Sequence, residues 1–303
     1  MRILVVGAGA MGCLFSSRLK RVGHEVSLVE ILPERVDEIN RNGIRVEGVS
    51  GSYRMKVPVY STPPSQEPDL AILCVKAYDT LQAAQSIQGV LGPDAWVLTL
   101  QNGIGNVEIL SEVLGVERVL GGVTAEGATL LGPGRIRHAG QGDTILQAIP
   151  NEEAIVTVFR EAGFQARAET RIQDFIWGKL LVNVGINALA AIARIRNGRL
   201  AELEGSRQIM EEAVAEALAV ARAMGISIPF PDPRARVMEV CRNTAGNLAS
   251  MLQDVMKHQP TEIEYINGAV VRLGNKLGIS TPVNATLASL VTVIQETYEE
   301  RAE

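Results

Sequence analysis

The chain has 303 residues, of which 47% are hydrophobic and 21% charged, so its composition is that of a soluble globular protein. This length is sufficient for two domains that each bury a core. A formal net charge of −5, with no Lys/Arg-rich block, argues against nucleic acid or an anionic membrane surface as a partner.

The cysteines and the terminal sequence indicate a compartment. Cys13, Cys74 and Cys241 lie far apart and form no CxxC or Cys/His cluster, so the sequence predicts no metal site and indicates a reducing environment. We expect Cys74, which lies in a strand-like run, to be buried and inert. The N-terminus shows no signal-peptide pattern. The most apolar later segment, residues 180–195, contains two asparagines and an arginine and falls short of a membrane span. These features predict a cytoplasmic protein without a membrane partner.

The first 30 residues alternate strand, glycine turn, helix and strand. Residues 2–6 predict a buried strand, 14–23 a helix and 24–30 a second strand, and GAGAMG follows the first strand. In the dinucleotide fingerprint the first glycine allows a tight turn, the second lets the backbone approach a pyrophosphate, and the third lets the helix pack closely on the strand. Free N–H groups at the helix N-terminus favour phosphate. The sequence therefore predicts a nucleotide-binding turn formed by Gly7, Ala8, Gly9, Ala10, Met11 and Gly12.

The second strand ends at Glu30, eighteen residues after Gly12. An acid at this position accepts hydrogen bonds from the adenine ribose hydroxyls and repels the additional phosphate of NADP. The alternative interpretation is a solvated acid at a strand end. Arg35 lies five residues further on, within reach of a phosphate, so NADH is favoured while NADPH stays open.

Further strand-like runs alternate with helical segments through the first half of the chain. They cover residues 56–61, 69–77, 96–103, 118–132, 144–149 and 163–169. This layout predicts a mostly parallel, doubly wound Rossmann-type sheet with helices on both faces. Lys76 and Asn102 lie near the ends of two of these runs, and ligands of open α/β sheets bind at the carboxyl ends of strands. We therefore expect both residues to face the cofactor, with a solvated loop position as the alternative for each.

After residue 169 the hydrophobic pattern changes to the helical period of 3.6. The pattern predicts helices over residues 174–195, 206–225, 232–257 and 261–277, and a last segment, 281–303, completes the chain. The domain boundary is expected near residue 168, which separates a dinucleotide-binding domain, 1–168, from an all-helical substrate-binding and catalytic domain, 169–303.

The first of these helices carries a polar stripe. Lys179, Asn183 and Asn187 are spaced four residues apart among Leu, Val and Ile, so they share one face of the helix. This stripe is either the wall of a wet pocket or a set of core polar groups satisfied by neighbours. Further along, Thr261 and Glu264 have the spacing of a capping box, which places Glu262 in a first helical turn, where an acid stabilises the helix dipole.

These motifs together resemble the ketopantoate reductase (2-dehydropantoate 2-reductase) family. The resemblance rests on GAGAMG, CVKA, LQNGIG, WGKLLVNVGINALAAI, the RNG at 196–198, NLASMLQDV and TEIEYINGAVVRLG, which occur in the expected order over nearly the full length. It implies a Rossmann domain followed by a helical domain, with the reaction in the cleft between them.

Carried over residue by residue, the resemblance makes Lys179 the general acid and Glu262 its acidic partner. It places Lys76 and Asn102 between cofactor and substrate. In the implied reaction, hydride from a nicotinamide attacks the C2 ketone of a 2-keto acid, and an ammonium stabilises the growing negative charge and delivers a proton. The residues that the resemblance assigns to substrate binding are Asn102, Asn183, Asn187, Asn197 and Ser250.

The chain departs from the family pattern at one position. Members that use NADPH commonly carry an arginine just past the second strand, where this chain has Ile31 behind Glu30. This favours NADH over NADPH, the usual cofactor of the family.

The resemblance implies NAD(P)H-dependent reduction of 2-dehydropantoate to (R)-pantoate, a step toward pantothenate and coenzyme A. The alternative is an NAD-dependent D-2-hydroxyacid dehydrogenase of the same family that acts on another branched or aromatic 2-keto acid. A non-catalytic cofactor sensor is disfavoured because it would not need Lys179 and Glu262, and a 3-hydroxyacid dehydrogenase is disfavoured by SMLQD and TEIEYINGA. The expected partners are a small 2-keto acid and a second copy of the chain in a homodimer.

Overall fold

The computed structural model of the protein describes residues 1–149 and 153–300. The chain forms two compact units, one of residues 1–101 and 106–172 and the other of residues 102–105 and 173 onward. The short loop after Gln101 therefore packs with the second unit. Residues 301–303, at the end of the last predicted segment, lie outside the described residues.

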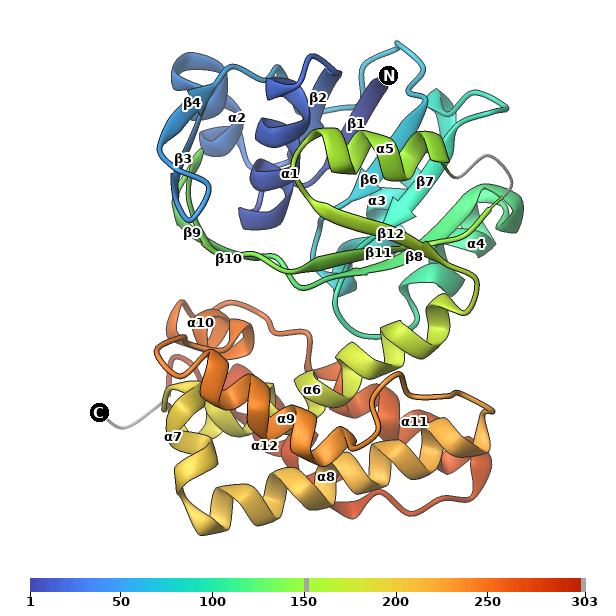
Figure 1. The fold of residues 1–303 in the computed structure, drawn as a ribbon. Coiled ribbons are helices and arrows are strands. Elements are labelled where there is room, and N and C mark those ends of the chain that lie inside the picture. Colours follow the sequence, from blue (N-terminus) through green and yellow to red (C-terminus); the bar gives the residue numbers. More distant parts are fainter. Residues whose placement is uncertain (150–152, 301–303) are drawn as a thin grey trace. The chain divides into compact units, whose positions relative to one another are not determined.

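The first unit is built on an eight-stranded sheet in the order β12-β11-β8-β7-β6-β1-β2-β5 (Figure 1). All neighbouring strands are parallel except β8 and β11. The run from β5 to β8 has the strand order of the Rossmann fold, so the predicted mostly parallel sheet is confirmed. The strands are β1 (Arg2–Val6), β2 (Glu25–Val29), β5 (Val59–Tyr60), β6 (Leu70–Leu73), β7 (Trp96–Thr99), β8 (Val119–Thr124), β11 (Asp143–Gln147) and β12 (Gln165–Glu169).

Helices cover both faces of this sheet, as predicted. Alternate residues of β1 belong to different cores: Ile3 and Val5 pack with α1 and α5, whereas Leu4 and Val6 pack with α3 and α4. Both faces of the strand are thus buried, which explains its continuous apolar sequence. The helices are α1 (Ala10–Arg21), α2 (Pro33–Asn42), α3 (Thr80–Ile87), α4 (Asn106–Leu114) and α5 (Glu153–Glu161), and the 3₁₀ turns are η1 (Ala77–Asp79), η2 (Gln88–Val90) and η3 (Val116–Arg118).

A second, four-stranded sheet in the order β4-β3-β10-β9 was not predicted. Its strands are β3 (Ile44–Gly48), β4 (Tyr53–Met55), β9 (Gly127–Gly132) and β10 (Arg135–Gly140). The predicted single run 118–132 is in fact two strands, because the chain leaves the large sheet after Thr124 and enters the small one at Gly127. These short strands bury few apolar side chains; in β10 only Ile136 and His138 are buried, so the hydrophobic pattern is weak.

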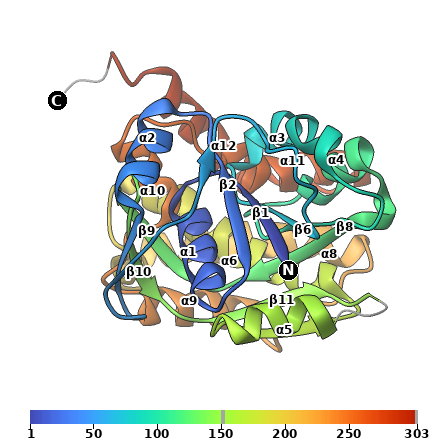
Figure 2. The ribbon, with the colours of Figure 1, turned by 90° about the horizontal axis from the view of Figure 1, so that it is seen from above.

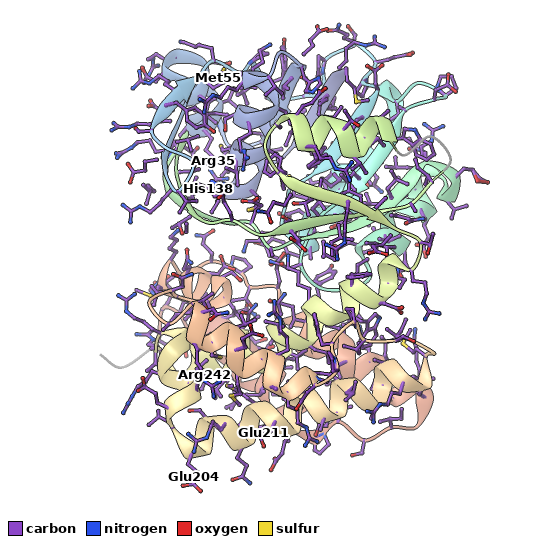
Figure 3. The ribbon with its side chains drawn as sticks, viewed as in Figure 1. Arg35, Met55, His138, Glu204, Glu211 and Arg242 are labelled. Carbon is purple, nitrogen blue, oxygen red and sulfur yellow. The ribbon has the colours of Figure 1, made fainter. Side chains whose placement is uncertain are left out.

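The small sheet packs against α1, the helix that follows the glycine turn (Figure 2). His138 on β10, labelled in Figure 3, lies 2.5 Å from the Glu126 carboxylate, and both side chains are buried. The Arg18 guanidinium of α1 lies 3.9 Å from the same carboxylate and donates a hydrogen bond to the Ala162 carbonyl at 2.9 Å. A buried charged cluster therefore connects the small sheet to α1.

The second unit is helical. Its elements are α6 (Ile172–Ala193), α7 (Asn197–Glu202), α8 (Glu204–Ala223), α9 (Pro233–Asn243), α10 (Ser250–Met256), η4 (Ile263–Tyr265), α11 (Asn267–Leu277) and α12 (Pro282–Glu296). Contrary to expectation, α6 is long and apolar enough by length and composition to cross a membrane, but 67% of its most apolar window is buried inside the protein. Its side chains, including Trp177, Leu181 and Val184, belong to the core of this unit, as in the central helix of a globular bundle.

The predicted helix 232–257 is wrong, since the chain forms α9 and α10 with a loop at residues 244–249. The loop is held by a distant segment. The backbone N–H groups of Asn197 and Gly198 donate to the carbonyls of Asn247 and Ala245. A Cβ on Gly198 would lie 2.6 Å from that of Ala245, so the two segments touch.

The predicted capping box is also wrong. The Thr261 hydroxyl accepts from the Ile263 N–H at 3.3 Å, and Glu264 pairs with Arg272 instead of closing the box. Only the 3₁₀ turn η4 follows Glu262, and α11 begins at Asn267. The Tyr265 carbonyl accepts a hydrogen bond from the Ile104 N–H at 3.0 Å, so this carbonyl is engaged outside the helix.

The glycine turn gives a stability prediction. A Cβ on Gly12 would lie 1.9 Å from the Gly7 carbonyl oxygen, whereas a Cβ on Gly9 meets nothing within 4 Å. Because overpacking against backbone forces a shift, Gly12→Ala is expected to lower the free energy of unfolding by about 2 kcal/mol. Gly9→Ala, at a φ of −71°, should change it by less than about 1 kcal/mol. Urea unfolding of the protein without nucleotide measures both, and equal losses would contradict the packing explanation.

Candidate active site

The glycine turn of the first unit has the geometry of a phosphate site. Gly7 has a φ of +100°, and a Cβ there would approach Val75 to 2.9 Å. Gly9 is the N-cap of α1 and makes no side-chain cap, and the first turn of the helix contains no acidic residue. The helix therefore begins without a side-chain cap and without an acid in its first turn, an arrangement that leaves its N–H groups suited to a phosphate.

Glu30, which follows β2, is buried and fixed by four donors. Its carboxylate accepts hydrogen bonds from the N–H groups of Ala8 at 3.2 Å, Ile31 at 2.8 Å and Leu32 at 3.1 Å. The guanidinium of Arg35, labelled in Figure 3, lies 3.0 Å away and pairs with it. Ile31 is 66% exposed. The acid thus contacts the glycine turn, and the arginine predicted to reach a phosphate is engaged with Glu30.

The segment after β6 carries Lys76, which is half-buried at the start of η1. The Gln101 side-chain amide donates to the Val75 carbonyl and to the Thr80 hydroxyl, each at 2.9 Å. Gln101 in turn is oriented by Thr99, whose hydroxyl donates to its Oε1 at 2.8 Å. Gln101 was missed by the sequence reasoning, although it stands in the same LQNG stretch as Asn102.

The cysteines of the first unit lie close to the glycine turn. The Cys13 thiol is buried and donates to the Ala8 carbonyl at 3.4 Å, and burial raises its pKa to about 12. Cys74 is half-buried rather than buried, and burial of its thiol raises that pKa as well. Neither thiol is a nucleophile at neutral pH. Within residues 1–149 and 153–300, no three His, Cys, Asp or Glu side chains gather as metal ligands.

In the second unit, Lys179, Asn183 and Asn187 all lie on α6, so the predicted helix is confirmed there. Lys179 is half-buried, and burial lowers the pKa of its ammonium to about 8, an effect that the negative charge of Glu262 partly offsets. The lysine is therefore mostly protonated at neutral pH and close to its pKa, which suits proton transfer.

The two asparagines of the stripe have unsatisfied groups. The Nδ2 atoms of Asn183 and Asn187 are buried and have no hydrogen-bond partner in the described part of the chain. A buried unpaired donor costs free energy, and native proteins retain few of them. This favours a pocket wall that awaits an acceptor over a satisfied polar core.

Asn197 and Ser250 are placed differently. The Asn197 amide donates to the Thr244 hydroxyl at 2.9 Å and so helps to hold the 244–249 loop. Its Oδ1 is buried and has no partner within residues 1–149 and 153–300. Ser250, the first residue of α10, is exposed.

Glu262 and Asn102, 160 residues apart in sequence, meet in the second unit. Glu262 is buried, and the Asn102 amide donates to its Oε2 at 3.4 Å. Gly103 has a φ of +80°, and a Cβ there would lie 2.4 Å from the Tyr265 carbonyl oxygen, so the 102–105 loop packs tightly beside η4. The structure therefore brings together Asn102, Glu262 and, through its charge, Lys179.

Asn267 is a further buried amide that the sequence reasoning missed, although it lies in the quoted ING stretch. Its Nδ2 donates to the Val184 carbonyl of α6 at 3.3 Å and to the Asn284 Oδ1 at 3.0 Å. Asn284 donates in turn to the Glu216 carboxylate at 2.7 Å. This series of hydrogen bonds connects α11 to α6 at Val184, which lies between the two asparagines of the stripe.

Comparisons with known proteins agree with this architecture. Residues 3–151 match the family described as "Ketopantoate reductase PanE/ApbA", and residues 171–295 match "Ketopantoate reductase PanE/ApbA C terminal". The chain is 37% identical over 302 residues to a 2-dehydropantoate 2-reductase of Halobacterium salinarum, which covers 97% of this chain and 99% of the relative. It is 35% identical over 300 residues to a protein of the same name from Archaeoglobus fulgidus, which covers 97% and 98%.

Solved structures show the same fold. The crystal structure of a PanE/ApbA family ketopantoate reductase from Ralstonia eutropha JMP134 has a TM-score of 0.93 and 34% identity, with coverage of 99% of this chain and 100% of the other. The ternary structure of D-mandelate dehydrogenase with NADH and anilino(oxo)acetate has a TM-score of 0.92 and 29% identity, with the same coverage.

A Rossmann-type sheet followed by a helical unit that holds a lysine and a carboxylate defines a pyridine-nucleotide-dependent oxidoreductase. The family matches and the relatives narrow this class: the chain belongs to the ketopantoate reductase family.

Substitutions of two buried asparagines can distinguish a binding role for the α6 stripe from a structural role. Asn187→Leu removes a buried donor that has no partner, so the free energy of unfolding should stay within about 0.5 kcal/mol of wild type or rise. Asn267→Leu, the matched control, breaks two hydrogen bonds and should cost about 3 kcal/mol. Thermal and urea unfolding measure the difference. If Asn187→Leu destabilises as strongly as Asn267→Leu, Asn187 is a core residue and not part of a pocket wall.

Proposed function

We propose that the protein is an NAD(P)H-dependent reductase that converts 2-dehydropantoate to (R)-pantoate. The observation that carries the proposal is the arrangement in the second unit, where Lys179 and Glu262 act on each other electrostatically and α6 presents two unpaired buried amides. Family membership and relatives named 2-dehydropantoate 2-reductase support the same reaction.

The first unit supplies the cofactor site in this proposal. The residues fit a dinucleotide because space is open at Gly9, the α1 N-terminus is uncapped, and the Glu30 carboxylate stands beside the turn. The residues Gly7 to Gly12 would hold the pyrophosphate, Glu30 the adenine ribose and Lys76 the nicotinamide end. The bound cofactor supplies the hydride. NADH is proposed as the preferred form, because Ile31 provides no cation for a 2′-phosphate and Arg35 is paired with Glu30.

In the proposed mechanism, Lys179 is the general acid. Its ammonium stabilises the negative charge that develops on the C2 oxygen and then gives that oxygen a proton. The amide N–H groups of Asn183 and Asn187 donate to the substrate carboxylate without adding a charge. Glu262, held by Asn102, accepts a hydrogen bond from the substrate hydroxyl and keeps Lys179 protonated. The exposed Ser250 and the unpaired Oδ1 of Asn197 are proposed as further substrate contacts.

A second candidate function is oxidation and reduction of another D-2-hydroxyacid and its keto acid. The similarity to the D-mandelate dehydrogenase structure that holds NADH favours it, as does Ile31. The stripe on α6 suits any 2-keto acid, because carboxylate and carbonyl are common to the class.

Cytoplasmic location and a homodimer are proposed as well. The three cysteines are free in the described part of the chain, which suits a reducing compartment.

Substrate specificity tests the proposal most directly. Initial rates with NADH and with NADPH are measured on ketopantoate, 2-ketoisovalerate and phenylglyoxylate. Ketopantoate should give a kcat/KM at least about 100-fold higher than 2-ketoisovalerate, because the analogue lacks the hydroxyl and leaves buried polar groups unpaired. A preference for phenylglyoxylate would establish the second candidate, and no turnover of any keto acid would reject both.

The pH profile tests Lys179. Because the acid must be protonated, kcat/KM should be level below about pH 8 and fall as pH rises through that value, the pKa of this lysine. Lys179→Ala should reduce turnover at least about 100-fold with nucleotide binding retained, while Lys276→Ala, at an exposed position of α11, should not. In Lys179→Arg, the kcat/KM of the remaining activity should fall at a higher pH than in wild type, because arginine has a higher pKa than lysine. An unshifted profile in Lys179→Arg would exclude Lys179 as the titrating acid.

A further inference from the structure

At the ribose end of the proposed cofactor site, the negative charge of Glu30 is offset by a neighbouring positive charge. The Glu30 carboxylate and the Arg35 guanidinium lie 3.0 Å apart, so their charges largely cancel at a distance. The carboxylate that a Rossmann site uses against a 2′-phosphate is therefore neutralised by its own neighbour. Rejection of the phosphate requires a further negative group.

Asp79 is such a group. It follows β6, while Glu30 follows β2, and β1 with its glycine turn pairs with both strands. The carboxyl ends of these parallel strands share one edge of the sheet. Asp79 occupies the N-cap of α3, where an aspartate ordinarily accepts from the helix N–H groups, yet its side chain makes no cap hydrogen bond. The Asp79 carboxylate therefore accepts no hydrogen bond from the N-terminal N–H groups of α3.

The position of Asp79 is fixed by its neighbours. Its backbone N–H donates to the Lys76 carbonyl at 2.9 Å, and the next residue, Thr80, is held by Gln101 and donates to the Asn106 Oδ1 at 2.9 Å. Partial burial, and then the negative charge of Glu30, raise the pKa of the Asp79 carboxyl. The two acids therefore share one electrostatic environment.

We propose that Asp79 is a specificity-determining residue that disfavours a nucleotide with a 2′-phosphate, so that Asp79, more than the paired Glu30, sets the preference for NADH over NADPH. The inference rests on the cofactor site of the proposed function. A phosphate placed beside Glu30 meets a paired acid and arginine, which follow β2 and lie in α2, and an acid of the 77–79 turn that makes no cap hydrogen bond. Lys76, the other charged residue of this segment, lies at the opposite end of the turn.

The test compares two fragments that differ only by the 2′-phosphate, 5′-AMP and 2′,5′-ADP, by calorimetric titration of the full chain. Asp79→Asn should raise the affinity for 2′,5′-ADP at least about fivefold and leave that for 5′-AMP within about twofold. The gain should shrink in 1 M salt, since the effect is electrostatic. Asp94→Asn is the matched control, because Asp94 is an exposed acid of the same unit that precedes β7, at the amino edge of the sheet.

Turnover gives the second readout. Asp79→Asn should raise kcat/KM for NADPH relative to that for NADH, mainly through KM. If both fragments bind and their affinity ratio is the same in Asp79→Asn as in wild type, Asp79 has no role in specificity, while the proposed function stands. If neither fragment binds to wild type, the cofactor site itself is wrong and both proposals fail.

Discussion

The cost of burying polar groups is the constraint on which the second unit depends. Helix α6 is the core helix of this unit, and the same helix carries a lysine and two asparagines. Burial lowers the pKa of Lys179 to about 8, and two amide nitrogens have no hydrogen-bond partner among the described residues. The amide nitrogens of Asn267 and Asn284 are hydrogen-bonded, although the Asn267 Oδ1 is also buried without a partner in the described part of the chain. Buried unpaired donors cost free energy, and two of them on one helix face are the reason that we propose a ligand site at the stripe.

In the first unit, the constraint is the close approach of backbone segments at the glycine turn. Gly7 takes a left-handed conformation and Gly12 touches the Gly7 carbonyl, so the turn has no room for side chains at these two positions. Open space at Gly9 and an uncapped helix are the features on which the proposed phosphate site rests. The acid that follows β2 accepts a hydrogen bond from the Ala8 N–H of the same turn, so its carboxylate is fixed beside the turn. A buried cluster connects α1 to the small sheet through Arg18, Glu126 and His138.

The charged residues beside the glycine turn bear on the choice of cofactor. The relatives and matched family establish a ketopantoate reductase scaffold, and the D-mandelate dehydrogenase structure shows that the same scaffold accommodates NADH. In this chain the position past β2 holds Ile31, and the nearby Arg35 is occupied by Glu30. Sequence inspection of Glu30 alone therefore does not establish the charge at this end of the sheet, because it does not show the ion pair with Arg35.

Features determined by neighbours along the chain could be predicted from the sequence. The glycine turn, the alternation of strands and helices, and the stripe on α6 depend on spacing, which the sequence states directly. Features determined by distant contacts could not. The loop between α9 and α10 exists because residues 197 and 198 bind its backbone, and η4 ends where the Tyr265 carbonyl is taken by Ile104. The small sheet and the meeting of Asn102 with Glu262 likewise join separate segments. Periodicity and propensity report the preferences of a local stretch, whereas a hydrogen bond between segments far apart in sequence has an energy that exists only once the chain has folded.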